Sequence, residues 1–296
     1  MKILLLGKNG QVGWELQRAL SPLGDVISLD RQSVDFCGDI GNINELRATI
    51  RKLQPTVIVN AAAYTAVDKA EADRATAQLI NAGAVQAMAQ EAVSLGALLV
   101  HYSTDYVFPG TGVEPWTEEA IVAPVNFYGE SKLAGERAII ESGCKHLIFR
   151  TSWVYAARGS NFAKTMLRLG RERESLNVIA DQIGAPTGAD LIADISAHVI
   201  PKAMINPALG GLYHLAASGE TSWCEYAKLV IETAKSSGEV LAAQQVLPIQ
   251  TSQYPTPANR PLNSRLNTTK LRNAFSLCLP DWKLGVRRML TEILNK

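Results

Sequence analysis

The chain has 296 residues, of which 47% are hydrophobic and 19% are charged, and this composition excludes an intrinsically disordered protein. Twenty-nine basic and twenty-eight acidic residues give a formal net charge of +1, without the long Lys/Arg run that a nucleic-acid partner would favour. A length near 300 residues predicts one full domain with a smaller second lobe.

The cysteines and the N-terminal segment indicate the compartment. Cys37, Cys144, Cys224 and Cys278 are scattered without a CxxC pair, as expected for thiols in a reducing environment. The apolar run Ile3–Leu6 ends at Gly7, which is too short for a signal-peptide core or a membrane span. We therefore expect a cytoplasmic protein that binds neither membrane nor nucleic acid.

The first half of the chain alternates short aliphatic runs with longer amphipathic stretches, a pattern typical of β-α-β units around a buried parallel sheet. A long Ala-rich helix is expected over Ala75–Leu95, between the third and fourth strands. The predicted fold is α/β, a Rossmann-like doubly wound parallel sheet. Its expected strands are Lys2–Leu6, Val26–Asp30, Thr56–Asn60, Leu98–Ser103 and His146–Arg150.

Beyond about residue 150 the pattern is less regular. Helices are expected at Asn161–Gly170 and Ala189–Ile200, a strand at Gly211–Leu215, and an irregular proline-rich segment at Pro255–Pro261. We predict a dinucleotide-binding domain over residues 1–150 and a smaller, mainly substrate-binding lobe over residues 151–296. The boundary is soft and the segments are expected to interleave.

A glycine-rich turn follows the first predicted strand. Gly7, Gly10 and Gly13 enclose Gln11 and Val12 and lead into a helix. Missing side chains let a pyrophosphate approach the backbone, and the helix N-terminus favours its charge. The spacing is G-x-x-G-x-x-G, not the commoner G-x-G-x-x-G, and plain turn chemistry is the alternative.

Acidic and small residues follow the next strands. Asp30 could accept hydrogen bonds from the adenosine ribose, or cap a turn, whereas Arg31 could meet a 2′-phosphate, so the choice between NADH and NADPH stays open. Asp39 and Ile40 could flank the adenine, or Asp39 could be a solvated loop carboxylate. The small residues of Asn60–Ala63 would let a ligand lie against the backbone, or simply permit close packing.

The segment Tyr128–Lys132 carries the strongest chemical signal. A separation of four residues places a phenol and an ammonium on one helical face, where the ammonium would lower the pKa of the phenol and make it a usable proton donor. Thr104, at the end of the fourth strand, could hold a substrate oxygen in position. An exposed Tyr with a solvated Lys is the common alternative.

These motifs together resemble the extended short-chain dehydrogenase/reductases, and the resemblance to the dTDP-4-dehydrorhamnose reductase family covers the whole chain. It rests on the glycine turn and on five further segments, Ser103–Phe108, Tyr128–Glu136, Arg150–Tyr155, Asp181–Thr187 and Arg260–Leu266. The resemblance implies NADPH- or NADH-dependent reduction of the C4 ketone of dTDP-4-dehydro-L-rhamnose to dTDP-L-rhamnose, in nucleotide-sugar and O-antigen biosynthesis. Tyr128 would protonate the oxygen, Lys132 would tune Tyr128, and Thr104 would assist.

The same resemblance implies two sets of binding residues. The sugar would contact Thr104, Asp105, Tyr128 and Trp153, although Trp153 could equally be a core aromatic. Arg260, in a proline-braced loop, could bind the substrate pyrophosphate or be a solvated surface residue. The dinucleotide would contact Gly7, Gly10, Gln11, Val12, Gly13, Asp30, Asp39, Ile40, Ala62, Ala63, Tyr64, Thr65, Tyr128 and Lys132.

The resemblance also implies a homodimer that can hold Mg²⁺. The matching carboxylates are Glu15, Asp190 and Glu292, and oxygen ligands suit magnesium. Asp190 departs from the expected Glu and is one methylene shorter. Three unrelated surface acids are the alternative.

Two other function classes compete with the reductase. A nucleotide-sugar epimerase or dehydratase would share the Tyr/Lys pair and the fold. A dehydratase, however, would be expected to carry a Thr-Asp-Glu arrangement here, and Tyr106 occupies the position of its Glu. A non-catalytic subunit, such as the regulatory partner of methionine adenosyltransferase, also looks like this family. The intact set of Thr104, Tyr128 and Lys132 favours chemistry over binding alone.

Overall fold

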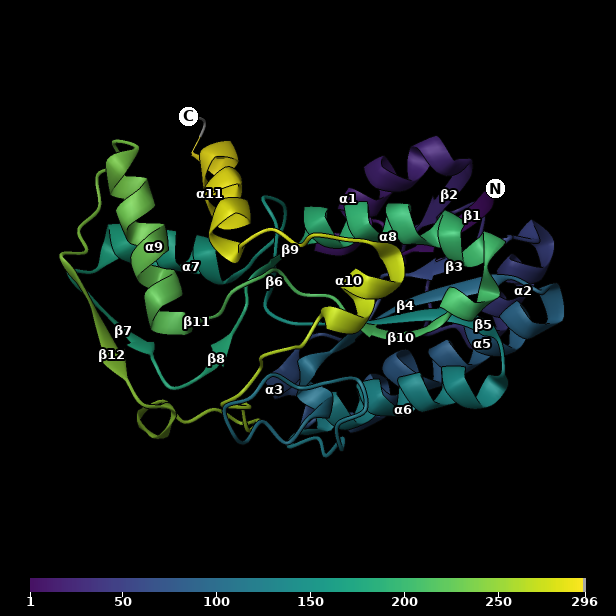
Figure 1. The fold of residues 1–296 in the computed structure, drawn as a ribbon, viewed down its shortest axis with the longest axis horizontal. Coiled ribbons are helices and arrows are strands. Elements are labelled where there is room, and N and C mark those ends of the chain that lie inside the picture. The colour runs from purple at the N-terminus through teal and green to yellow at the C-terminus, as the bar shows by residue number, and fades with distance from the viewer. Residues whose placement is uncertain (295–296) are drawn as a thin grey trace.

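A computed structural model describes residues 1–294, and its centre is a six-stranded, entirely parallel sheet (Figure 1). The strand order is β10-β5-β4-β3-β1-β2, so the predicted doubly wound α/β fold is confirmed. The order reverses between β1 and β3, and in such sheets ligands bind at the carboxyl ends of the strands at this point. The strands are β1 (Lys2–Leu6), β2 (Asp25–Leu29), β3 (Val57–Asn60), β4 (Leu98–Thr104), β5 (Lys145–Thr151) and β10 (Gly211–His214).

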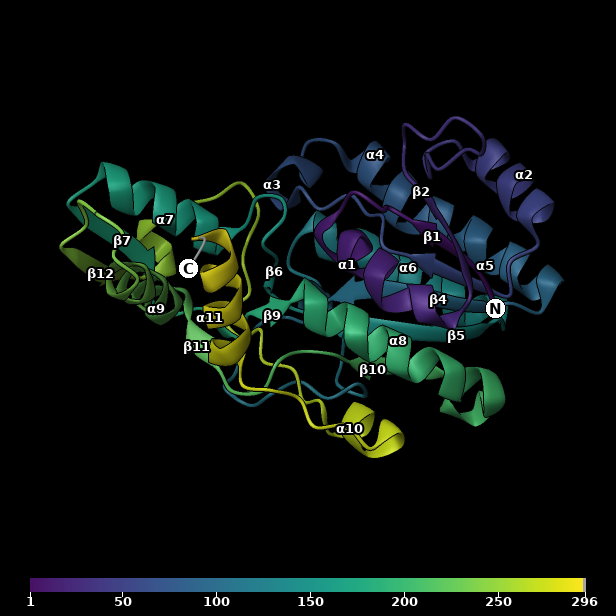
Figure 2. The same cartoon turned by 90° about the horizontal axis from the view of Figure 1, so that it is seen from above.

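Helices cover both faces of the sheet (Figures 1 and 2). Alternate residues of β1 enter different cores: Ile3 and Leu5 pack under α1 and α8, whereas Leu4 and Leu6 pack under α2 and α5. Aliphatic side chains on both faces are what a fully covered parallel sheet requires. One face carries α1 (Gln11–Leu20), α8 (Ala189–Ile205) and α10 (Thr269–Phe275), and the other carries α2 (Ile43–Leu53), α5 (Ala84–Leu95) and α6 (Phe127–Ser142).

The second lobe has a hydrophobic core of its own, built from residues 155–294. In Figure 1 its helices and the paired strands β7 and β12 lie to the left of the sheet. The lobe contains α7 (Phe162–Glu172), α9 (Trp223–Ser236), α11 (Trp282–Ile293), β7 (Ser175–Ile179) and β12 (Gln245–Ile249). Two short pairs, β6 (Val154–Tyr155) with β9 (Thr187–Gly188) and β8 (Ile183–Gly184) with β11 (Thr221–Ser222), complete the strands.

Segments after residue 150 also return to the sheet, because β10 pairs with β5 and α8 packs against α1. The division at residue 150 into a dinucleotide-binding domain and a substrate-binding lobe therefore stays a prediction about function. In the fold, segments from beyond residue 150 belong to both parts. Among residues 1–294, no helix is both long and apolar enough to cross a membrane.

The expected long helix over Ala75–Leu95 forms with an interruption. It consists of α4 (Arg74–Gln78), a π-helical turn over Leu79–Gly83, and α5. Within that turn the Asn81 side chain donates to the Tyr64 carbonyl and to the Ser131 hydroxyl, both at 3.0 Å. The turn thus joins the loop after β3 to α6. A short helix, α3 (Val67–Ala70), precedes α4.

Candidate functional site

The glycine turn after β1 meets the requirements of a phosphate site. Gly7 has φ +87°, and a Cβ there would lie 2.7 Å from the Ala62 amide nitrogen. A Cβ on Gly13 would lie 2.0 Å from the Gly7 carbonyl oxygen, so Gly13 permits α1 to pack against the turn. Gly10 caps α1 without a side-chain hydrogen bond. The N–H groups of the first helical turn are therefore available to an anion.

Two cavities meet at this turn. The larger, of about 580 Å³, lies at the carboxyl ends of β1, β3, β4 and β5. The smaller, of about 130 Å³, shares Gly7, Gly10, Ala62 and Ala63 with it. The smaller cavity is also lined by Asn9, Asp30, Arg31, Gly38, Asp39, Ile40 and Ile80. The predicted adenosine-binding residues thus come together on one side of the turn, and the catalytic candidates lie on the other side.

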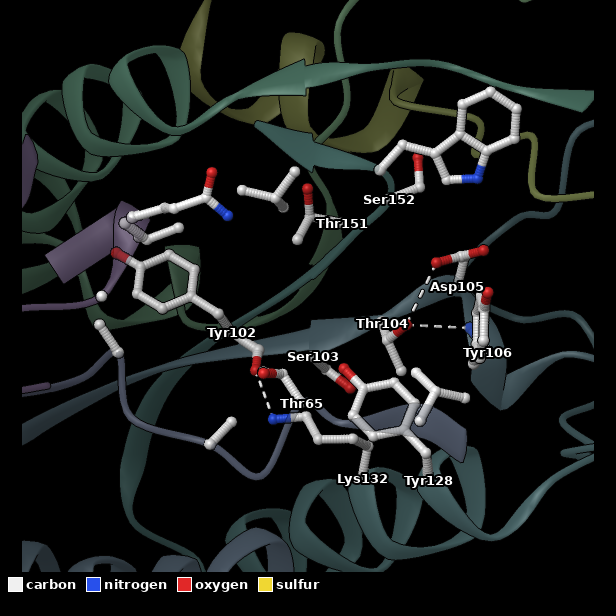
Figure 3. Close-up of a pocket in the computed structure, with 18 of the residues that line it drawn as sticks. Thr65, Tyr102, Ser103, Thr104, Asp105, Tyr106, Tyr128, Lys132, Thr151 and Ser152 are labelled. Carbon is white, nitrogen blue, oxygen red and sulfur yellow. Dashed lines mark hydrogen bonds between the residues drawn. The ribbon is translucent and has the colours of Figure 1, made fainter. Parts of the chain in front are cut away.

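The first two turns of α6 present Tyr128 and Lys132 to the larger cavity (Figure 3). Asn126 caps the helix, because its side-chain oxygen accepts from the Gly129 N–H at 2.8 Å. Gly129 lets the helix approach the turn after β4 closely, since a Cβ there would lie 2.2 Å from the Tyr106 carbonyl oxygen. Cap and glycine together fix the position at which Tyr128 enters the cavity.

Thr104 and Asp105 face the same cavity from the end of β4. The Thr104 hydroxyl donates to Asp105 Oδ1 at 3.1 Å and accepts from the Tyr106 N–H at 3.1 Å. Asp105 Oδ2 is buried without a partner among the described residues. Burial raises the pKa of Asp105 from 3.8 to about 7, opposed by the nearby hydroxyls of Ser264 and Thr104. The free oxygen can therefore receive a hydroxyl of a bound molecule.

The protonation of Tyr128 differs from the sequence expectation. Burial, reinforced by the Asp105 charge, raises the pKa of Tyr128 above 10, whereas an adjacent ammonium would lower it. The reason is visible in Figure 3: Lys132 Nζ is directed to the Tyr102 carbonyl, to which it donates at 2.7 Å. In this state Tyr128 is a phenol that can give a proton to an oxygen in the cavity.

Two stacked indoles close the far side of the cavity. Trp153 and Trp223 lie with ring centroids 3.6 Å apart and planes inclined by 14°. Trp153 has φ +49°, an uncommon conformation for a non-glycine residue, and Gly184 leaves room for its ring. Strained backbone held by its surroundings is frequent at ligand sites. Trp153 is therefore a cavity wall as well as a packed aromatic.

Asp30 directly follows β2 and lies within a network of polar groups. Its carboxylate accepts from the Ser33 hydroxyl at 3.0 Å and from the side-chain amide of Asn9. Arg31 lies beside Asp39, with its Nε 3.7 Å from Asp39 Oδ1, and its side chain is 78% exposed. Because Asp30 and Arg31 both line the smaller cavity, neither NADH nor NADPH is excluded.

Arg260 lies at the rim and already has a partner. Its Nη2 is 2.7 Å from Asp68 Oδ2, and its guanidinium lies 5.9 Å from the centroid of the Tyr106 ring. Arg260 is not among the residues that line the larger cavity, although Tyr106 is. A phosphate bound by Arg260 would have to share this guanidinium with Asp68.

The expected magnesium ligands come together without forming a metal cluster. Glu15, Asp190 and Glu292 line one cavity of about 40 Å³. Arg18 lies 3.5 Å from Glu15, and Arg288 lies 3.5 Å from Asp190. Within residues 1–294 no group of three or more His, Cys, Asp or Glu side chains is placed to hold a metal ion. The metal and the homodimer stay predictions.

Some predicted contacts lie off the cavities, and some lining residues had no sequence signal. Tyr64 and Gly13 line neither cavity; the Tyr64 N–H donates to Asn81 instead, at 2.9 Å. Trp223 was not foreseen, since it is 70 positions from its stacking partner. Ser103 and Thr151 each carry a buried hydroxyl without a partner among residues 1–294, and their positions at strand ends could have indicated them.

Comparisons with known proteins agree over the full length. A family model described as the RmlD substrate binding domain matches residues 1–295. The chain is 59% identical over 295 residues to dTDP-4-dehydrorhamnose reductase of Escherichia coli strain K12, covering 100% of this chain and 99% of that protein. It is 47% identical over 302 residues to the protein of the same name from Burkholderia thailandensis, with 100% of both covered.

Solved structures give the same result. The crystal structure of dTDP-4-dehydrorhamnose reductase from Bacillus anthracis, in complex with NADP, is 38% identical. It matches with a TM-score of 0.87 over 99% of this chain and 100% of the other. More distant structures share the fold alone, as does DesIV, a dTDP-glucose 4,6-dehydratase from Streptomyces venezuelae, at 20% identity and a TM-score of 0.78.

Proposed function

The chain belongs to the dTDP-4-dehydrorhamnose reductase family and is an oxidoreductase, and on this premise we propose that it reduces dTDP-4-dehydro-L-rhamnose to dTDP-L-rhamnose. The reduction would use NADPH or NADH. The observation that carries the proposal is the larger cavity, because one space brings together the glycine turn, Tyr128, Lys132 and Trp153. A hydride donor and a ketone can meet there.

The residues around the glycine turn fit a dinucleotide. The uncapped N-terminus of α1 would hold the pyrophosphate, and Gly7 would let it approach the backbone. Asp30, Asp39 and Ile40 would surround the adenosine in the smaller cavity. The nicotinamide ring, when bound, supplies the hydride. Lys132 and the small side chains after β3 would orient that end.

Tyr128 is the proposed proton donor. Its raised pKa keeps the phenol protonated at neutral pH, which is the form that reduction of a ketone consumes. Thr104 would hold the carbonyl oxygen beside Tyr128, as a preorganised hydroxyl can. Asp105 would accept a hydrogen bond from a sugar hydroxyl through its free oxygen. These contacts would place the C4 carbonyl between the hydride donor and the proton donor Tyr128.

The specificity residues follow from the cavity walls. Trp153 would pack its indole against the sugar ring, and Arg260 would bind the substrate pyrophosphate after loosening its pair with Asp68. Tyr106, in the place where a second acid would assist water elimination, supports reduction over dehydration.

The test follows nicotinamide absorbance with purified protein and dTDP-4-dehydro-L-rhamnose generated in situ. NADPH and NADH are added separately, with and without magnesium. Stoichiometric oxidation that yields dTDP-L-rhamnose is the expected result, and the relative rates rank the two cofactors. Dinucleotide retained through the incubation without oxidation would contradict the proposal and favour a redox-neutral epimerase or a binding subunit.

A further inference from the structure

Three buried polar side chains form a chain beneath the proposed catalytic centre. Asn60 ends β3, His101 lies on β4, and Lys132 lies on α6, each with only 1% of its surface exposed. Asn60 Nδ2 lies 3.2 Å from His101 Nδ1, and His101 Nε2 lies 3.1 Å from Lys132 Nζ. The proposed reaction gives neither Asn60 nor His101 a role, although both are polar groups that are costly to bury.

The direction of the hydrogen bonds is set at one end by the backbone. The Ala62 N–H, which can only donate, lies 3.1 Å from Asn60 Oδ1. The Asn60 oxygen is thereby occupied as an acceptor, so its NH₂ group faces His101 and donates to Nδ1. A neutral imidazole that accepts at Nδ1 carries its proton on Nε2. The Nε2–H of His101 therefore points at Lys132.

Only a neutral amine can accept that hydrogen bond, since an ammonium has three donors and no lone pair. If Lys132 were an ammonium, both ends of this row of hydrogen bonds would be donors, namely the Ala62 N–H and Lys132 Nζ. Somewhere along Ala62, Asn60, His101 and Lys132, two N–H groups would then face each other without an acceptor between them. Turning the Asn60 amide or moving the His101 proton to the other ring nitrogen only moves this clash to another contact. We propose that His101, oriented by Asn60, is a positioning residue that disfavours the ammonium form of Lys132 in the ligand-free protein.

The surroundings of Lys132 also disfavour its ammonium form. Burial lowers the pKa of Lys132 from 10.5 to about 8, opposed only by Glu136. Glu136 is itself paired with Arg150, with Oε2 2.6 Å from Nη2. Burial lowers the pKa of His101 well below 6.5, so the imidazole is neutral. The remaining contact of Lys132 is neutral, since Nζ donates to the Tyr102 carbonyl.

The inference rests on the proposed function, in which Tyr128 donates the proton. A neutral Lys132 does not stabilise the Tyr128 phenolate, and the pKa of Tyr128 is indeed raised, with burial and the Asp105 charge as its main causes. The hydrogen-bond chain of Asn60, His101 and Lys132 thus favours a protonated Tyr128 until a ligand occupies the site. Lys132 becomes an ammonium when the hydrogen-bond chain is broken or when a bound molecule offers Nζ a new acceptor.

The experiment follows the ¹³Cε resonance of Lys132 with pH in ligand-free protein labelled at lysine Cε. Lys132→Met identifies the signal. In the wild type, Lys132 should titrate at or below a pH of about 8, while exposed lysines titrate near 10.5. In His101→Gln the new amide can turn its oxygen to Nζ, so the pKa of Lys132 should rise by about one unit or more.

Asn60→Asp is the second variant. An isosteric carboxylate accepts from both the Ala62 N–H and His101 Nδ1, which moves the imidazole proton and again favours the ammonium. Since the added charge acts in the same direction, His101→Gln is the sharper test. His146→Gln is the matched control, because the His146 ring bonds only the nearby Cys144 carbonyl among residues 1–294, and it should leave the titration of Lys132 unchanged.

The outcomes separate this inference from the proposed function, because the titration needs no turnover. A wild-type Lys132 that titrates near 10.5 would overturn the inference, and so would a folded His101→Gln protein with an unchanged Lys132 titration. If both variants fail to fold, the wild-type titration alone decides. An inactive wild type with a low Lys132 pKa would refute only the reductase proposal. In an active His101→Gln protein, the alkaline limb of the reduction rate should move to lower pH, because an ammonium lowers the pKa of Tyr128.

Discussion

Replacing Glu136 with Gln should destabilise the protein because it breaks an ion pair that joins α6 to β5. Glu136 and Arg150 make two parallel bonds, at 2.9 and 2.6 Å, and their side chains are 1% and 5% exposed. Arg150 also lies over the Phe108 ring, and its Nη1 has no partner among the described residues. Glu136→Gln would leave that guanidinium charge buried and uncompensated.

Breaking a buried pair costs about 3–5 kcal/mol, and the lower end applies because the amide oxygen keeps one bond. For a chain of this size, about 3 kcal/mol corresponds to a loss of about 6 °C in Tm. Differential scanning calorimetry measures this loss. The matched control is Glu172→Gln, whose exposed pair with Arg168 on α7 should contribute under about 1 kcal/mol. Equal shifts in the two variants would refute the reasoning.

Three further changes test the proposed site. Tyr128→Phe should lower kcat by about 10²-fold or more with nearly unchanged dinucleotide Kd, and near-normal turnover would exclude Tyr128 as the donor. Gly13→Ala should weaken NADPH binding by at least about tenfold in a fluorescence titration, because its Cβ would meet the Gly7 carbonyl, whereas Gly83→Ala has room and should not. Asp105 has a folded pKa raised to about 7, so its contribution to stability is present at low pH and is lost as pH rises through about 7. The Tm of Asp105→Asn relative to wild type should therefore increase between pH of about 5 and about 8, and a constant difference would contradict this assignment.

The strands could be predicted from the sequence because a covered parallel sheet needs aliphatic residues on both faces. All five predicted strands of the first half form within a residue or two of their expected bounds, and Gly211–His214 forms as well. Local patterns carry no information on strand order, so the pairing of β10 with β5 could not be derived. The helix expected over Ala189–Ile200 instead continues through Pro201 to Ile205, since one lost backbone bond is offset by packing of its apolar face.

The candidate site could be predicted where its residues follow strand ends or share one helical turn. Asp30 and Asp39 line one cavity as expected, and Tyr128 and Lys132 share another. The direction of the Lys132 side chain could not be predicted, because it depends on His101, which reads as an ordinary strand residue in the sequence. Contacts between segments far apart in the chain leave no local signal, and the same limit applies to metal ligands.

The stacked indoles of Trp153 and Trp223 also give the molecule an optical property. Trp153 follows the last residues of β5, whereas Trp223 begins α9 in the second lobe. Aromatic rings at this separation couple their electronic transitions, and their combined absorption is sensitive to small rotations. A sugar ring that displaces one indole, or a shift of α9 relative to the sheet, would alter that coupling. Binding of a ligand at the site should therefore change the absorption spectrum of the unlabelled protein.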